Sequence, residues 1–273
     1  MTTTTISRRD VLTGAGALAG AALLPRLVSA QDPAQDVQAL LDASAAAMAA
    51  LTSFRFELAT VNGTSTILDN LELKKVAGQV MRPDSFSADV TAGLAIVDLT
   101  VQVIGIGSRL WVTDPLDQGG KMIELALDDA TGGGSLAALI NPDRVFLTAV
   151  GLVENAAITG TEKIDGVETT VVTGEFDASR LADLATPGAG DGAGEDAADA
   201  DEGGAGGLPA ELILERMPVT IWIDDAKRVV RLELEGQLTS SESPDVVRGI
   251  DFYDFDEPVR IEEPTNVQST TGG

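Results

Sequence analysis

The sequence contains no cysteine and no histidine. Without cysteine there are no disulfide bonds, no thiolate metal sites and no lipid-modified cysteine after a signal peptide. Without histidine the chain lacks the side chain most often used as a general base and as a metal ligand. A Gly-x-Ser-x-Gly elbow and a phosphate-binding loop are also missing. We therefore expect no enzyme activity, no cofactor and no metal site.

Basic residues are scarce. The chain has 18 lysines and arginines against 43 aspartates and glutamates, which gives a formal net charge of −25. A surface of this charge repels polyanions, so we expect no nucleic-acid partner. The charge is typical of a surface adapted for solubility, or for a salty or acidic exterior.

The N-terminal apolar stretch, Val11 to Leu24, is shorter than the roughly 20 residues needed to cross a bilayer as a helix. It follows the pair Arg8-Arg9 and precedes the small-residue site Val28-Ser29-Ala30. This order is typical of a twin-arginine signal peptide, predicted over residues 1–30. We expect an exported protein that is periplasmic, in the cell envelope or extracellular. Cleavage after Ala30 and retention as an anchor both remain open.

Residues 31–264 have the length and pattern of a single domain. A helix is expected over Pro33 to Thr52, because apolar residues recur there at helical spacing. These residues are Val37, Leu40, Leu41, Met48 and Leu51. Short strands with period-two alternation follow, joined by Asn, Gly, Pro and Asp turns, which favours an antiparallel sheet. The strands are expected at 54–59, 71–82, 86–91, 97–103, 108–113, 121–125, 155–164, 168–174, 219–223, 229–238 and 246–255.

Helical segments are also expected within 135–150 and at 178–184. Residues 187–207 are rich in glycine, alanine and acidic residues, and we expect a disordered, solvated insertion there. A polar tail is expected over 265–273. The fold class is therefore α+β, with a long antiparallel sheet whose apolar face is covered by the helices at 33–52 and 135–150.

The apolar face of this sheet is the candidate binding site. It is lined by aliphatic residues and has few polar partners, so it forms either a packed core or a dry cavity for an aliphatic ligand. Trp111 and Trp222 lie on strands opposite the alternating aliphatics, where we expect them to pack against a layer. The residues expected to point inward are Phe56, Leu58, Val90, Leu99, Val101, Val103, Leu110, Val112, Leu139, Phe146, Ile221 and Leu232.

Several local sequences carry a resemblance to a known family. They are Asn141-Pro142-Asp143 before a helix, Gly160 to Gly166 (Gly-Thr-Glu-Lys-Ile-Asp-Gly), Val171 to Gly174, Met217 to Ile223 (Met-Pro-Val-Thr-Ile-Trp-Ile) and Tyr253-Asp254-Phe255. In their order along the chain they resemble the LppX/LprA/LprF/LprG family of cell-envelope lipoproteins, over nearly all of the mature chain.

The resemblance implies a strongly curved half-barrel sheet wrapped on a few helices, similar to LolA and LolB, around an apolar cavity. It implies binding of an acylated lipid or glycolipid and its transport across the envelope by a monomer, with a membrane lipid transporter as a further partner. The family is normally anchored through a lipidated cysteine, which this chain lacks. The alternative is a non-transporting structural or signalling envelope protein with a packed core.

Overall fold

The computed structural model describes residues 33–67, 71–94, 97–115, 117, 119–126, 150–177, 216–237 and 242–268. The predicted signal peptide, the segment 178–184, the acidic insertion and all of 135–150 except Val150 lie outside these ranges. Within the described ranges, no helix combines the length and the apolar character needed to cross a membrane.

The described residues form one long helix and thirteen strands. The helix is α1 (Pro33–Ala50). The first half of the sheet contains β1 (Ser53–Asn62), β2 (Ser65–Ile67), β3 (Leu71–Met81), β4 (Ser85–Leu94), β5 (Val97–Ile106), β6 (Arg109–Thr113) and β7 (Met122–Ala126). The second half contains β8 (Glu154–Ile164), β9 (Val167–Asp177), β10 (Arg216–Asp224), β11 (Val229–Glu235) and β12 (Val247–Tyr253). The last strand, β13 (Val267–Gln268), returns to the edge of the first half beside β7.

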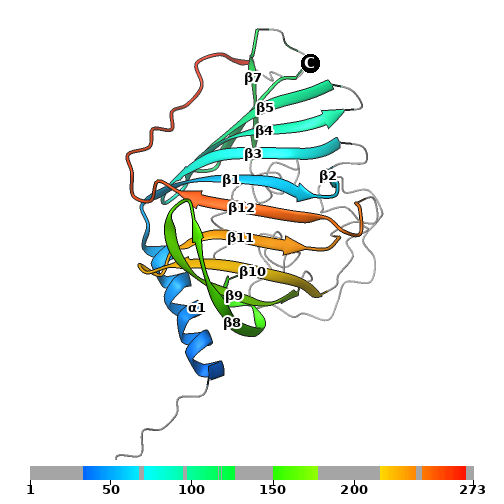
Figure 1. Cartoon of the computed structure of the whole chain (residues 1–273). Coiled ribbons are helices and arrows are strands. Elements are labelled where there is room, and N and C mark those ends of the chain that lie inside the picture. Colours follow the sequence, from blue (N-terminus) through cyan, green and yellow to red (C-terminus); the bar gives the residue numbers. More distant parts are fainter. Residues whose placement is uncertain are drawn as a thin grey trace, which may run out of the picture. The chain divides into compact units, whose positions relative to one another are not determined.

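All strands belong to a single sheet (Figure 1). Its order is β13-β7-β6-β5-β4-β3-β1-β12-β11-β10-β9-β8, with β2 paired to β3. Neighbouring strands are antiparallel except β13 and β7, which run parallel. Each half is a meander, and the halves join where β1 pairs with β12, for example Phe56 with Phe252. The expected antiparallel sheet is therefore confirmed.

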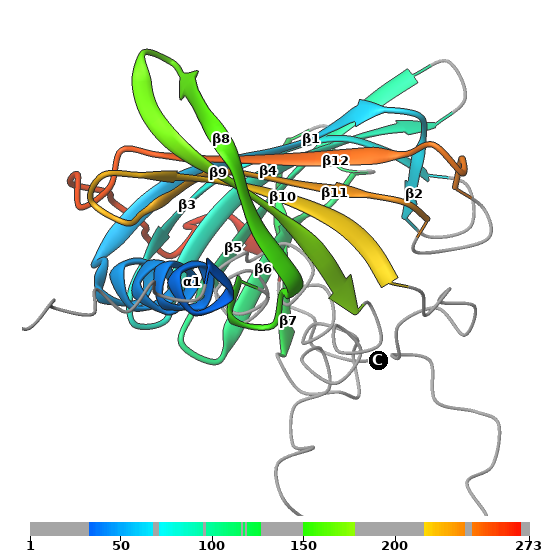
Figure 2. The same cartoon turned by 60° about the horizontal axis from the view of Figure 1, so that its bottom comes forward.

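The sheet is strongly curved, and α1 lies on its concave side (Figure 2). We call the face that carries Phe56 and Leu58 the inner face, because residues of α1 are in the same apolar cluster with them. The opposite face, which carries Arg55, is the outer face. An α+β fold with a curved half-barrel sheet is confirmed. Of the two expected covering helices, only α1 lies within the described residues.

The amphipathic pattern of α1 determines how it packs. Val37, Leu41, Ser44 and Met48 recur every three or four residues, and all four are buried. At the C-terminal end, Arg82 Nη1 donates to the carbonyl oxygens of Met48, Ala49 and Leu51 at 2.6–2.7 Å. Met48 O also accepts from Leu51 N at 3.3 Å. The guanidinium therefore caps the C-terminal end of α1 and fixes it against the sheet.

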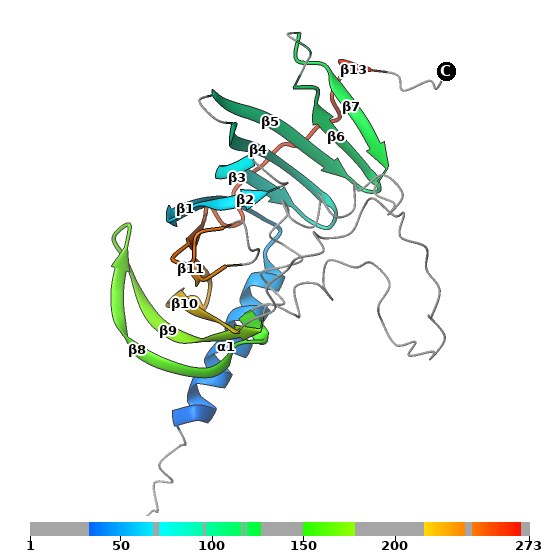
Figure 3. The same cartoon turned by 90° about the vertical axis from the view of Figure 1, so that its right-hand side faces the viewer.

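The chain beyond β12 runs as an extended strap, residues 257–268, past the neighbouring strands to the edge of β7 (Figure 3). Its contacts are with the outer face. Gln79 Nε2 donates to Arg260 O at 3.1 Å, and Ile261 and Val267 pack in a second apolar cluster with Ile104, Trp111 and Met122. Trp111 is 1% exposed, so the expected packing of this residue against a layer is confirmed. Within the polar tail predicted from residue 265, Val267 and Gln268 form β13 on the edge of β7.

A carboxylate fastens the start of this strap to the start of the sheet. Asp256 accepts hydrogen bonds from Thr52 N at 2.7 Å and from Thr52 Oγ1 at 2.8 Å. These bonds favour the charged form, so the pKa of Asp256 lies below its ordinary value of 3.8. The stability that they contribute is present above the unfolded pKa and is lost as the pH falls through the folded one.

This gives a prediction for Asp256→Asn. Residue 256 has a positive φ of 56°, a conformation that asparagine also tolerates, so the variant changes the charge with little change of backbone. We expect wild type to be more stable than the variant at pH 5–8, and this advantage to shrink as the pH falls below about 4. Urea unfolding of both proteins across this pH range measures the difference in their free energies of unfolding. A difference that does not change with pH would contradict the lowered pKa of Asp256.

Candidate functional site: the inner face of the sheet

The strand register places the predicted inward residues on one face. Leu58 pairs with Ile250 on one side and with Val76 on the other, and Val76 pairs with Val90, which pairs with Val101. On the other side Ile250 pairs with Leu232, and Leu232 pairs with Ile221. The result is one unbroken aliphatic row across seven strands: Ile221, Leu232, Ile250, Leu58, Val76, Val90 and Val101. We call it the aliphatic row.

A second row lies beside it, toward the C-terminal end of α1. It contains Phe252, Phe56, Gly78, Ala88, Val103 and Val112. Leu110 follows on β6, opposite Gly105, and Leu99 lies on β5 opposite Ala92. Ten of the twelve residues expected to point inward are therefore on the inner face. The other two, Leu139 and Phe146, lie outside the described residues.

Burial along this face is deep but uneven. Phe56, Val90, Val103, Leu110, Ile221 and Leu232 belong to the buried main cluster, and Leu58, Val101 and Val112 are partly buried against it. Leu99 is half-buried. Such burial fits both a packed core and a closed apolar cavity.

Several inner-face residues were not among the predicted set. Phe54 and Phe252 meet edge to face with ring centroids 5.9 Å apart, and both are in the main cluster with Val76 and Ile250. For Phe54 the signal was present in the sequence, because this residue is in phase with Phe56 on its own strand. For Val76, Ile250 and Phe252 the link to the predicted inward residues runs through strand pairing.

Two glycines let aromatic rings lie against the sheet. A Cβ atom on Gly78 would lie 2.7 Å from the Phe56 ring and 2.6 Å from the Ser87 carbonyl oxygen. Gly105 has a similar relation to the Phe86 ring. Real side-chain atoms do not approach so closely, so these positions admit only glycine while the rings stay where they are.

We therefore expect Gly78→Ala to displace the Phe56 ring and to lower the free energy of unfolding by about 1–3 kcal/mol. Urea unfolding measures this loss. Gly160→Ala is the matched control, because Gly160 lies on β8 and a Cβ there would meet no atom within 4 Å. Equal effects of the two substitutions would contradict the close approach of Phe56 to the sheet.

The inner face ends in a charged pair. Arg248 precedes Ile250 and Phe252 in the period-two alternation of β12, and it pairs with Thr60 and Leu234. Its guanidinium forms an ion pair with Glu242, and the two side chains are only 8% and 2% exposed. Arg248 was not among the residues predicted to point inward, although its phase with Ile250 and Phe252 places it on the same face.

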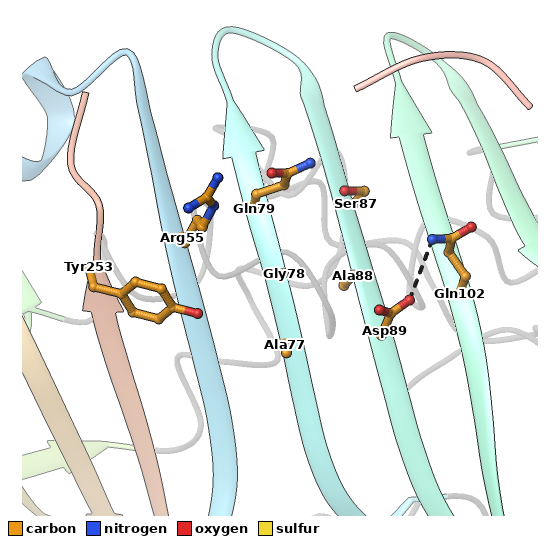
Figure 4. A pocket seen from close by; sticks show the side chains of 9 residues that line it. All are labelled: Arg55, Ala77, Gly78, Gln79, Ser87, Ala88, Asp89, Gln102 and Tyr253. Atoms are coloured by element: carbon orange, nitrogen blue, oxygen red, sulfur yellow. Dashed lines mark hydrogen bonds between the residues drawn. The ribbon is translucent and has the colours of Figure 1, made fainter. Parts of the chain in front are cut away.

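The outer face carries a hollow of a different character (Figure 4). Its volume is about 320 Å³, and the outer-face residues that line it are Arg55, Ala77, Gln79, Ser87, Asp89, Gln102 and Tyr253. Gly78 and Ala88, which belong to the second row of the inner face, also border it. None of these residues belongs to the predicted inward set, and most of the side chains are polar. Arg55 is engaged with Asp254 at 2.5 Å. This hollow does not suit an aliphatic ligand.

Trp222 also lies on the outer face. It is 8% exposed, and its Nε1 donates to Glu162 Oε2 at 2.9 Å.

Within the described part of the chain, no group of acidic side chains is arranged to hold a metal ion.

Comparison with known proteins identifies the family. The model of the LppX_LprAFG lipoprotein family matches residues 36–201, more than half of the chain. The chain belongs to the LppX_LprAFG lipoprotein family. The expectation drawn from the local sequence motifs is thereby confirmed, and membership of a lipoprotein family supports an envelope or exported location.

Two solved structures of LppX_LprAFG proteins share the fold. LprF from Mycobacterium bovis is 21% identical, with a TM-score of 0.55, and the match covers 85% of this chain and 98% of LprF. LppX from Mycobacterium tuberculosis is 19% identical, with a TM-score of 0.50, and the match covers 84% of this chain and 99% of LppX. No curated protein matches the chain by sequence.

Proposed function

We propose that the protein binds an acylated lipid or glycolipid on the inner face of its sheet and carries it across the cell envelope. The observation that carries this proposal is the aliphatic row, which runs without a polar interruption across seven strands in a member of a lipoprotein family. Such a surface needs no catalyst or cofactor to bind a hydrocarbon chain, and the protein is proposed to be a monomeric carrier rather than an enzyme.

The energetics of binding favour a long chain. Each buried methylene contributes about 0.8 kcal/mol. About a dozen methylenes would contribute roughly 10 kcal/mol, which is comparable to the roughly 4–15 kcal/mol lost in translational and rotational freedom on association. Short-chain lipids should therefore bind poorly. A membrane lipid transporter is the proposed source or acceptor of the lipid.

Transfer between vesicles tests the carrier function. Donor vesicles would contain a fluorescent long-chain phospholipid with a quencher, and acceptor vesicles would be unlabelled phosphatidylcholine. The proposal expects fluorescence to rise faster with the protein than without it, in proportion to protein concentration. Binding of the lipid without any acceleration of transfer would favour the alternative, a non-transporting structural or signalling protein. That alternative is consistent with the deep burial of Phe56, Leu110 and Ile221.

The proposed route of export has its own test. Replacing Arg8 and Arg9 with lysines should leave precursor in the cytoplasm, because twin-arginine export reads the paired guanidinium groups. Immunoblotting of cytoplasmic and exported fractions measures this. Replacement of Arg26 with lysine, outside the pair, is the matched control and should leave export unchanged. Normal export of the doubly substituted protein would contradict the proposed route.

A further inference from the structure

The buried pair of Arg248 and Glu242 lies at one end of the proposed lipid site. On β12, Arg248 is two residues from Ile250, a member of the aliphatic row, and four from Phe252. Its cross-strand partners on the inner face are Thr60 and Leu234. Along this central strand the inner face thus changes from aromatic at Phe252, through aliphatic at Ile250, to cationic at Arg248.

The contacts of Arg248 occupy its whole guanidinium group. Its Nε donates to Ser65 Oγ at 3.2 Å, and its Nη1 donates to the carbonyl oxygen of Gly236 at 2.9 Å. Its Nη2 is buried and faces the Glu242 carboxylate as an ion pair. The buried cation is therefore held by two neutral acceptors and one anion.

Glu242 reaches Arg248 from outside the strands. Its Oε1 accepts from Ser65 Oγ at 3.1 Å and from Thr66 N at 3.4 Å. The backbone beside it is held by a hydrogen bond from Ser243 N to Thr64 O at 3.2 Å. The carboxylate therefore places a negative charge against Arg248 through a side chain with three rotatable bonds.

Burial of such a pair is weak support for stability, because removing two charges from water costs about as much as their attraction returns. A buried arginine is, however, well suited to bind a phosphate or carboxylate, since its planar fork can donate two parallel hydrogen bonds. Asp224, the other charged residue buried in the described chain, is bound to Arg228 in the turn after β10. Arg248 is thus the buried cation on the described inner face.

We propose that Arg248 is the headgroup anchor of the lipid site, an inference that rests on the lipid-binding function proposed above. The hydrocarbon chains lie along the aliphatic row, and an acidic group of the lipid, a phosphate or carboxylate, contacts Arg248. Glu242 occupies the position of that acidic group when no lipid is bound and turns away when the lipid enters. The ligand class is therefore an acidic acyl lipid, held in one orientation.

Displacement of Nile red, an uncharged apolar dye, tests the anchor. The competitors are dodecyl phosphate and dodecanol, below the concentration at which either aggregates, at pH 8. Both have the same chain, so the ratio of their inhibition constants isolates the headgroup. We expect dodecyl phosphate to compete at a concentration at least about tenfold lower than dodecanol, as is typical of a charge-assisted contact.

Two variants test whether the preference for dodecyl phosphate depends on Arg248 and Glu242. The double variant Arg248→Met with Glu242→Gln removes both charges together and should bring the ratio to within about twofold of unity. Glu242→Gln alone removes the competing anion and should increase the preference for the phosphate. The matched control is Arg55→Gln with Asp254→Asn, which removes an ion pair from the outer face and should leave the ratio unchanged.

The outcomes separate this inference from the proposed function. If neither Nile red nor dodecanol binds wild-type protein, the lipid-binding proposal itself fails. If both bind but wild-type protein does not prefer dodecyl phosphate, the role of Arg248 as headgroup anchor is contradicted, while lipid binding stands. This comparison uses wild-type protein alone. Inorganic phosphate at 10 mM should not abolish the preference. If it does, Arg248 binds free anions and is not a headgroup anchor.

Discussion

Replacing Arg248 with methionine should lower the free energy of unfolding by about 3–5 kcal/mol. The substitution leaves the carboxylate of Glu242, which is 2% exposed, without the cation that faces it. An unpaired charge in such a site has lost its hydration and gained nothing in return. Urea or thermal unfolding at pH 7 measures the loss.

The reason for the loss is tested by neutralising both residues. In the double variant Arg248→Met with Glu242→Gln, the amide oxygen can still accept from Ser65 and Thr66, and no charge remains at this site. We expect it to be within about 1 kcal/mol of wild type, since neutral replacement of a buried pair is often tolerated. Arg55→Met breaks an ion pair whose side chains are 41% and 42% exposed, and it should cost at most about 1 kcal/mol. Equal losses for Arg248→Met and Arg55→Met would contradict this account of the inner face.

Val101→Trp should abolish lipid binding and leave the fold nearly intact. Val101 ends the aliphatic row on β5, and its side chain is only partly buried against the main cluster. If lipid occupies the space above this row, the indole fills that space in place of the hydrocarbon. We expect a loss of affinity for a long-chain lipid of at least tenfold, with a change in the free energy of unfolding below about 1 kcal/mol.

Thr100→Trp is the matched control. Thr100 is the neighbouring residue of β5 on the outer face, where it is exposed and pairs with Thr91. The same indole there should change neither affinity nor stability. In a packed core, by contrast, Val101→Trp would overpack the interior and cost about 1–3 kcal/mol. A variant that is destabilised by this amount and still binds lipid would contradict the proposed site.

The local elements could be predicted because strong short-range patterns determine them. In β5, Leu99, Val101 and Val103 alternate with exposed or half-exposed polar residues, and the strand follows this alternation. Asp165-Gly166 forms the turn between β8 and β9, with positive φ at both residues, as expected for a two-residue hairpin. The face on which each predicted side chain lies follows from the same alternation.

The long-range arrangement was less accessible to prediction. The pairing of β1 with β12 joins residues about 200 positions apart, and no local pattern specifies which strands meet. The position of the strap was equally hard to predict, because residues 257–268 are mostly polar. From this strap, Ile261 and Val267 pack in the apolar cluster of Trp111. Arg248 was overlooked because a charged residue is usually placed on the solvated face, although its phase in β12 indicates the inner one.

The most direct test of the central claim, that the inner face holds an acyl lipid, is native mass spectrometry of the mature protein purified from an exporting host. The account predicts a species heavier than the polypeptide by one acylated lipid, which solvent extraction releases and which is missing from Val101→Trp. A wild-type protein that is free of lipid as purified, and that takes up none after incubation with a total lipid extract, would contradict it.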